Sequence, residues 1–281
     1  MTTFKTTCKL KTETDWLIGI GLHTGKDSRI RIIPGEPGKG IVFRNVVTGA
    51  VIPARLECVT NTVRCTELGF GSHAVSTVEH VLSALRGLDI YDATVEFSGE
   101  EMPIADGSSQ PFVRLLELAG LEPTDSSVVS IPVEKCIFLE GASGASIFAL
   151  PHSRLEICVI LDYPKVPFIG SQSFEYVEGD NYKELISPAR TYGFLSEIEW
   201  LRNNGLARGA TLENVVAIDS ESYATDLRFP DELVRHKMLD VIGDMSLLGA
   251  PLMAKIVAVK PSHSLNINLA RLINEAAHER C

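Results

Sequence analysis

The sequence predicts a protein of mixed α and β structure that is divided into two domains. Its 281 residues are more than one small domain usually needs, and 45% of them are hydrophobic, as expected for a well-cored protein. In each half, short strand-like runs are followed by helix-like runs. Residues 121–130 are polar and contain proline, which is typical of a linker, so we expect domains at 1–123 and 124–281.

The first half begins with strand-like runs over residues 16–20, 28–33 and 40–43, separated by turns rich in glycine and proline. His23 lies in one of these turns, where a side chain can be presented to a site, although an ordinary loop histidine is the simpler interpretation. We expect a helix from Ser76 to about Arg86, a strand over 93–97 and a helix over 111–118.

Two polar residues open the helix that begins near Ser76. Its apolar stripe, which starts at Val78, leaves Glu79 and His80 outside the core face. Ser76 and Glu79 have the spacing of a capping box, in which the glutamate only caps the helix. Glu79 could equally act as a general base, and the sequence alone does not separate the two roles. His80 has no comparable structural role.

In the second half, strands are expected over residues 136–139, 146–150, 155–161 and 256–259, and helices around 181–186, 193–204 and 230–248. A loop containing His263 follows the last strand. This is a common place for a catalytic acid, but with seven histidines in the chain a chance placement is easy.

The helix over 230–248 has a clear start and an unusual polar face. Pro230 and Asp231 suit a first helical turn. His236, Asp240 and Asp244 follow one another at intervals of four residues, so they lie along one stripe. A histidine and an aspartate one turn apart can bind one metal ion, whereas a weak ion pair on a solvated face is the more ordinary interpretation. The residues near His80 offer the second set of ligands that a metal site needs.

Composition excludes several classes of protein. A net charge of -10 without clustered Lys and Arg argues against nucleic-acid binding, but it leaves room for a small anionic substrate. The six cysteines form no C-x-x-C pair, which excludes thiolate zinc sites and redox dithiols. The opening residues lack the apolar core of a signal peptide, and no stretch could cross a bilayer, so we expect a cytoplasmic protein, with transient membrane proximity if it handles a lipid.

Several separated segments carry a pattern that can be compared with known families. They are Gly21–Gly25, Ser76–His80, Pro103–Ser108, Ala189–Phe194, Val234–Asp244 and Lys260–Asn266. Together they resemble the zinc-dependent UDP-3-O-acyl-N-acetylglucosamine deacetylase of lipid A (lipopolysaccharide) synthesis in Gram-negative bacteria. The resemblance covers nearly the whole chain, in the right order.

The resemblance implies an α+β fold of two similar domains, in which helices pack between two sheets and the active site lies at the domain interface. It also implies a monomer that binds one zinc ion per chain through His80, His236 and Asp240, a ligand set that iron accepts as well. Zinc lowers the pKa of a bound water to about 7, which makes it able to attack an acetamide carbonyl.

Roles for further residues follow from the same resemblance. Glu79 would be the general base. Thr191 would donate to the oxyanion. His263 would protonate the departing amine, and Asp244 would orient it. Lys237 would complete this catalytic group.

The expected substrate contacts lie around these residues. Lys237 and Lys260 would face the diphosphate, and Tyr163 would stack on uracil. Residues 193–219 resemble the family's insert, which forms a hydrophobic passage for the acyl chain. The remaining expected contacts are His23, Tyr192 and Phe194.

Some positions depart from the family pattern, and they bear on the shape of the passage and hence on the acyl length. Arg64 stands where an apolar residue is expected, Tyr192 replaces phenylalanine and Ser262 replaces glycine. Arg208 and Ala210 alter an apolar stretch of the insert, and Cys65 lies near the site.

Other functions fit less well. A zinc peptidase would need the H-E-x-x-H helix, which is absent. A non-catalytic UDP-sugar-binding protein would need neither Glu79 nor His263, and a purely structural module would not explain the polar stripe. A deacetylase of another acylated amino sugar is the remaining alternative.

Overall fold

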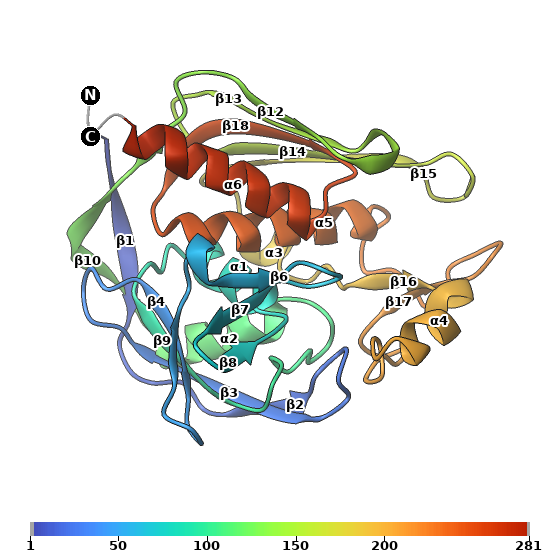
Figure 1. Cartoon of the computed structure of the whole chain (residues 1–281), viewed down its shortest axis with the longest axis horizontal. Helices are drawn as coiled ribbons and strands as arrows, with labels where there is room; N and C mark the ends of the chain where they lie inside the picture. The colour runs from blue at the N-terminus through green and yellow to red at the C-terminus, as the bar shows by residue number, and fades with distance from the viewer. Residues whose placement is uncertain (1–2, 280–281) are drawn as a thin grey trace.

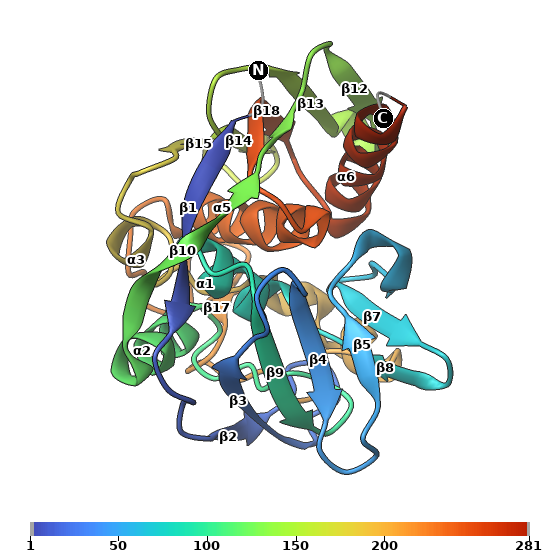
Figure 2. The ribbon, with the colours of Figure 1, turned by 90° about the vertical axis from the view of Figure 1, so that its left-hand side faces the viewer.

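Helices lie between two β-sheets in the structure, a computed structural model that describes residues 3–279 (Figure 1). The same layers are visible after a quarter turn, with one sheet above the helices and the other below them (Figure 2). This arrangement confirms the predicted α+β fold with helices between two sheets.

The first sheet comes from the first half of the chain. Its order is β2 (Leu17–Ile20), β3 (Asp27–Pro34), β9 (Ala93–Ser98), β4 (Ile41–Asn45) and β5 (Val51–Pro53). β3 alternates as the sequence predicts, because Ile30 and Ile32 are buried, whereas Arg29 is exposed and Arg31 is half-buried. The helices α1 (Glu79–Gly87) and α2 (Gln110–Ala119) pack next to this sheet (Figure 2).

A small three-stranded sheet lies beside the first one. It consists of β6 (Val59–Asn61), β7 (Glu67–Phe70) and β8 (His73–Val75), preceded by the short 3₁₀ turn η1 (Leu56–Cys58). The β6–β7 connection, residues 62–66, runs toward the helices.

The second sheet has the order β12 (Ile137–Glu140), β13 (Ser146–Pro151), β18 (Leu252–Val259), β14 (Glu156–Tyr163) and β15 (Gly170–Val177), and β11 (Ile131–Pro132) also pairs with β18. Its inner face buries Ile147, Val159 and Ile256. The helices α5 (Glu232–Met245) and α6 (His263–His278) cover that face. The turns η2 (Ala142–Gly144) and η4 (Ser246–Leu248) and the short helix α3 (Tyr182–Leu185) complete this half.

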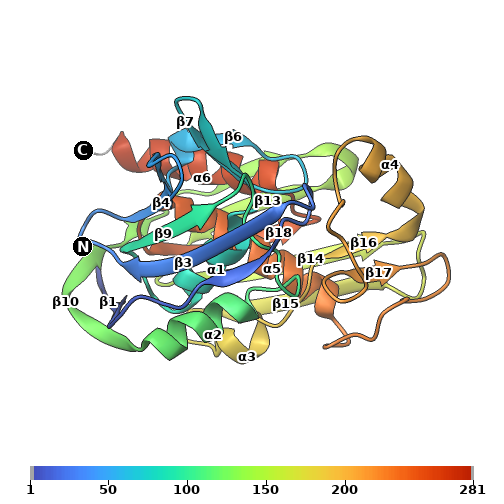
Figure 3. The same cartoon turned by 90° about the horizontal axis from the view of Figure 1, so that it is seen from below.

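An insert extends from one end of the molecule. β16 (Tyr192–Phe194) pairs in parallel with β17 (Val216–Ile218), and η3 (Leu195–Glu197) and α4 (Ile198–Asn203) follow β16. Figure 3 shows these elements away from the first sheet. The predicted helix over 193–204 is therefore wrong at its start, because Tyr192–Phe194 find a strand partner in β17 that lies far along the chain.

The predicted linker at 121–130 is also wrong in its structure. It is the strand β10 (Leu121–Val129), which pairs antiparallel with β1 (Phe4–Leu10). A two-stranded ribbon can expose one face to water, so the polar composition of this segment does not prevent pairing. The boundary between residues 123 and 124 falls inside β10, and the division into two domains stays a prediction.

Two further elements differ from expectation. His263 is the first residue of α6 rather than part of a loop, and Ser262 caps that helix by accepting a hydrogen bond from the Leu265 N–H. The helix predicted from Ser76 begins three residues later, at Glu79. None of the helices in the described part of the chain is long and apolar enough to cross a membrane.

Candidate active site

Three potential metal ligands meet where α1 crosses α5. His236 and Asp240 lie one turn apart on α5, and His80 is the second residue of α1. All three are buried, with exposed fractions of 3–4%. One nitrogen or oxygen atom from each lies within 4.8 Å of the other two. The interpretation of His236 and Asp240 as a solvated surface pair is therefore wrong, because α1 covers them.

A glycine lets the two helices approach so closely. A Cβ atom on Gly243 would lie 2.2 Å from the carbonyl oxygen of Glu79, a distance that no side chain tolerates. Gly243 lies three residues after Asp240 on α5, so this close contact of the two helices is beside the ligand cluster. The His80 and His236 rings are 5.2 Å apart, centre to centre.

The donor atoms of this cluster fit a metal ion. His236 Nδ1 donates to the carbonyl oxygen of Ala189 at 3.1 Å, which leaves Nε2 as the donor atom that faces Asp240. Within residues 3–279, His80 Nδ1 and Asp240 Oδ1 are buried without a hydrogen-bond partner. Buried polar atoms are rarely left unpaired, and unpaired atoms in a His/His/Asp set are typical of a metal site.

The protonation states also suit metal binding. Burial lowers the pKa of His80 to about 3 and lowers the pKa of His236 as well, so both imidazoles are neutral near pH 7. Burial alone would raise the pKa of Asp240. The charge of Lys237, whose Nζ lies 2.8 Å from Asp240 Oδ2, is the largest of the effects that outweigh burial and hold the pKa of Asp240 below its ordinary value. Two neutral nitrogens and one carboxylate are donors that zinc and iron accept.

A carboxylate and an imidazole face each other next to the ligands. His263 Nε2 lies 3.8 Å from Glu79 Oε1. Burial raises the pKa of Glu79 to about 7. Burial would lower the pKa of His263, but the Asp244 carboxylate, which accepts from His263 Nδ1 at 2.9 Å, raises it to about 9. At neutral pH the pair can therefore exchange protons with a substrate.

The alternative role of Glu79 as a helix cap is wrong. No side chain caps α1, and the Ser76 hydroxyl donates to the carbonyl oxygen of Glu100 instead. Glu79 Oε2 accepts from the backbone N–H of Thr66 at 3.0 Å. The Ser76 N–H that a capping box would pair with Glu79 donates to the Glu100 carbonyl oxygen instead, and the Glu79 carboxylate lies next to His263.

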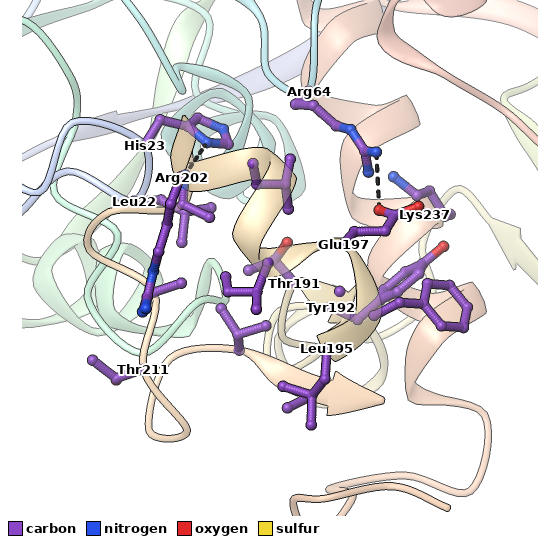
Figure 4. Close-up of a pocket in the computed structure, with 18 of the residues that line it drawn as sticks. Leu22, His23, Arg64, Thr191, Tyr192, Leu195, Glu197, Arg202, Thr211 and Lys237 are labelled. Atoms are coloured by element: carbon purple, nitrogen blue, oxygen red, sulfur yellow. Dashed lines mark hydrogen bonds and ion pairs between the residues drawn. The ribbon is translucent and has the colours of Figure 1, made fainter. Parts of the chain in front are cut away.

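A cavity of about 740 Å³ extends from Lys237 and His263 into the insert (Figure 4). Glu79 and the three ligands are not among the described residues that line it. Thr191, Lys237 and His263 line it beside the ligand cluster. Its far part is largely apolar, with Leu22, Phe194, Leu195, Ile198, Leu201 and Val215 among the lining residues. The cavity can therefore take a molecule with a polar end and an apolar tail.

Aromatic groups join the polar and apolar parts of the cavity. The Tyr163 and Tyr192 hydroxyls lie 2.9 Å apart, and the Tyr163 ring is 5.7 Å from that of Phe194. Lys237 lies over the Tyr192 ring at 5.5 Å from its centre. The hydroxyl of Tyr192, the departure from phenylalanine, is therefore used in a contact within the wall.

Two predicted substrate contacts lie at the margin. His23 lines the cavity, and its Nδ1 accepts from the Ala207 N–H at 3.4 Å. Lys260 is not brought to the cavity wall within the described residues, and its Nζ lies 3.5 Å from Asp162 Oδ2. Asp244 has no exposed surface and acts on the cavity only through His263.

The residues that depart from the family pattern have defined surroundings in the structure. Arg64 donates to Glu197 Oε2 at 3.0 Å across the cavity wall, which joins the β6–β7 connection to η3 (Figure 4). Ala210 lines the cavity, and the backbone N–H of Arg208 donates to the carbonyl oxygen of His23. Cys65 is buried and, among the described residues, takes no part in the lining, so it does not narrow the cavity directly.

Sequence reasoning missed two residues of this site. The Thr66 hydroxyl donates to Asp244 Oδ1 at 2.6 Å, and the Asn266 amide donates to Asp244 Oδ2 at 2.8 Å. Asn266 could have been suspected, since it lies one turn after His263 on the same helix. Thr66 carried no signal of its own, because only the fold brings it to α5.

Comparison with known proteins agrees with this geometry. The family described as LpxC, UDP-3-O-acyl N-acetylglycosamine deacetylase, matches residues 8–275. A protein of Myxococcus xanthus named UDP-3-O-acyl-N-acetylglucosamine deacetylase is 40% identical over 263 residues, which cover 92% of this chain and 83% of the relative. Proteins of the same name from Chlamydia felis and Trichormus variabilis are 40% and 37% identical, over 92% and 91% of this chain and 93% and 94% of theirs. The chain therefore belongs to the family of UDP-3-O-acyl-N-acetylglucosamine deacetylases.

Proposed function

We propose that this protein is a metal-dependent hydrolase that removes the N-acetyl group of UDP-3-O-(3-hydroxyacyl)-N-acetylglucosamine. Water is consumed, the amide C–N bond breaks, and the free amine and acetate are released. The observation that carries the proposal is the convergence of His80, His236 and Asp240, with the facing pair of Glu79 and His263 next to them. Family membership supplies the substrate class.

Zinc is the metal that we propose for the three ligands, and iron(II) is the alternative. Zinc at this position supplies Lewis acidity, which lowers the pKa of a water and polarises the amide carbonyl. The hydrogen bonds that the ligand side chains make to other groups favour metal binding. Ala189 fixes the ring of His236, and Lys237 holds one oxygen of Asp240 while the other stays open.

Glu79 and His263 move the protons of the reaction. The Glu79 carboxylate takes a proton from the attacking water, because its raised pKa makes it a better base than an exposed glutamate. The His263 imidazolium, kept cationic by Asp244, gives the Nε2 proton to the departing nitrogen. Thr191, which also lines the cavity, donates a hydrogen bond from its hydroxyl to the amide carbonyl oxygen, which becomes negative during the reaction.

The cavity and its rim position the substrate. The apolar part of the insert takes the acyl chain. Lys237 and, at the rim, Lys260 favour the diphosphate, and Tyr163 offers a ring to the uracil. In a Gram-negative cell this reaction would be the committed step of lipid A synthesis and would take place in the cytoplasm.

The test is acetate release from the acylated UDP-sugar, together with metal analysis of the same samples. We expect about one zinc per chain and steady acetate release by the wild type. Glu79→Gln should keep the metal and lose about 10²–10⁴-fold in turnover, since general-base catalysis contributes about that factor. His80→Ala should lose both metal and activity. If the metal-loaded wild type releases no more acetate than Glu79→Gln, the proposal is wrong.

A further inference from the structure

A single buried threonine contacts both halves of the proton-transfer pair. Thr66 ends the β6–β7 connection and is 1% exposed. Its backbone N–H donates to Glu79 Oε2 at 3.0 Å. Its hydroxyl donates to Asp244 Oδ1 at 2.6 Å, and the same oxygen lies 3.2 Å from His263 Nδ1. Thr66 therefore contacts the proposed base, Glu79, and both the proposed acid, His263, and the carboxylate of Asp244 that orients it.

The hydroxyl of Thr66 completes the shell of the Asp244 carboxylate. Oδ2 of Asp244 accepts from His263 Nδ1 and from the Asn266 amide. Among the described residues, Thr66 is the one whose side chain donates a hydrogen bond to Oδ1. Asp244 has no exposed surface, so water does not replace a lost donor easily. A buried carboxylate oxygen without a donor is costly, and the group would turn to find another partner.

The contacts also join the two halves of the chain. Thr66 and Glu79 come from the first half, whereas Asp244 and His263 come from the second. The distance of 3.8 Å between Glu79 and His263 therefore depends on how the β6–β7 connection lies against α5 and α6. Thr66 is the residue of that connection that hydrogen-bonds to Asp244 on α5 and to His263 on α6.

We propose that Thr66 is a positioning residue of the deacetylation reaction, which sets the separation and orientation of Glu79 and His263 through its hydroxyl on Asp244 and its N–H on Glu79. This inference rests on the proposed function. Thr66 itself does not line the cavity, and among the described residues its hydrogen bonds go to Glu79, Asp244, His263 and Val78 rather than to the three metal ligands. Its loss should therefore slow the chemical step and leave substrate binding nearly intact.

The kinetic test compares three variants of the zinc-loaded enzyme. Thr66→Val keeps the shape and removes the hydroxyl, and we expect kcat to fall about 10–100-fold, as for other residues that orient catalytic side chains, with KM changed less than about twofold. Thr66→Ser restores the hydroxyl and should stay within about threefold of the wild type. Thr60→Val is the matched control, because the Thr60 hydroxyl bonds to Glu67 on the exposed side of the same hairpin. It should behave as the wild type.

A second readout does not depend on turnover. In protein with ¹⁵N-labelled histidine, the Nδ1–H of His263, assigned by its loss in His263→Gln, should give a protected resonance in the wild type and in Thr66→Ser. It should broaden or disappear in Thr66→Val. If Thr66→Val does not fold, Thr66→Ala replaces it, since the smaller side chain also removes the hydroxyl.

The outcomes separate this inference from the proposed function. Absence of acetate release by the wild type would contradict the function, and the resonance would still report on Thr66. An unchanged kcat and resonance in Thr66→Val would overturn the role of Thr66. So would a loss in Thr66→Ser as large as that in Thr66→Val, or an effect confined to KM, even if the wild type is an active deacetylase.

Discussion

Glu79 and Asp240 are both buried carboxyl groups of the site, yet their pKa values move in opposite directions. Burial dominates at Glu79 and raises its pKa to about 7. At Asp240 burial also acts to raise the pKa, but the charge of Lys237 is the largest of the effects that outweigh it, and the pKa falls. Near neutral pH Asp240 therefore stays ionised, as a metal ligand needs to be, while Glu79 can take up a proton.

The pH dependence of the reaction should follow from these groups. Glu79 must be deprotonated to accept a proton, so kcat/KM should rise as the pH passes about 7. His263 must be protonated to donate one, so kcat/KM should fall as the pH passes about 9. The measurement is a profile from pH 5 to 10. His263→Gln should lose the alkaline limb and keep the acid limb. An alkaline limb that survives this change would exclude His263 as the acid.

Single residues were predictable from the sequence where a motif carries them. The spacing of His236 and Asp240 and the adjacency of Glu79 and His80 are visible without a structure. The choice between capping and catalysis at Glu79 was not, because it depends on the Thr66 N–H and on His263, both brought there by the fold. Lys260 shows that a motif can be present without placing its side chain in the cavity. The sequence predicted a contact of Lys260 with the diphosphate, but its ammonium group lies against Asp162.

At the scale of elements, the crossing of α1 and α5 decides the site. His80 and Glu79 come from α1, and His236, Asp240 and Asp244 from α5. The contact of Gly243 with the Glu79 backbone fixes how near the two helices lie. Any widening there would separate the three candidate metal ligands and would also move Glu79 away from His263.

Gly243→Ala should therefore damage both stability and metal binding. The new methyl group would overlap the Glu79 carbonyl oxygen, and overpacking of a core costs about 1–3 kcal/mol. We expect a lower free energy of unfolding in urea and weaker zinc retention against a chelator. Gly193→Ala is the control, because nothing lies within 4 Å of its added methyl group. Equal stability of the two variants would show that the helices can separate without harm.

The periodicity of the sequence predicted α1, α2 and α5, because each of these helices repeats its apolar residues along one face, and it predicted the strands β2, β3, β4, β9, β12, β13, β14 and β18. The helix α6 was not predicted. β10 and β16 were missed because each is defined by a distant partner, β1 and β17. The start of α5 shows the same limit. Glu232 suits a helix N-terminus in the sequence, but in the structure it is fully buried against the Arg190 guanidinium, a partner that no local pattern indicates.

At the scale of the whole molecule, the proposed metal would hold the two halves of the chain together. His80 belongs to the first half, and His236 and Asp240 belong to the second. An ion that binds the folded state but not the unfolded chain stabilises the fold by mass action. The halves should therefore be linked more weakly in the metal-free protein.

Removal of the metal should lower the melting temperature as well as activity. At 100 times the Kd, a bound ligand adds about 2.7 kcal/mol of stability, which corresponds to several degrees in a protein of this size. The measurement is thermal unfolding before and after chelation, followed by zinc addition. Glu79→Gln should show the same shift as the wild type, and His80→Ala should show none. A melting temperature that does not change on exhaustive chelation would contradict the bridging role.

The ribbon of β1 and β10 limits how the molecule can open. β10 is the segment that passes from one half to the other, and β1, near the beginning of the described chain, is hydrogen-bonded along it (Figure 2). A crossing that is stiffened in this way makes a poor hinge. We therefore expect an acylated ligand to enter and leave by movement of the insert, while the two sheets keep their mutual distance throughout a catalytic cycle. The insert is tied to the β6–β7 connection by the half-exposed ion pair of Glu197 and Arg64, which salt can weaken.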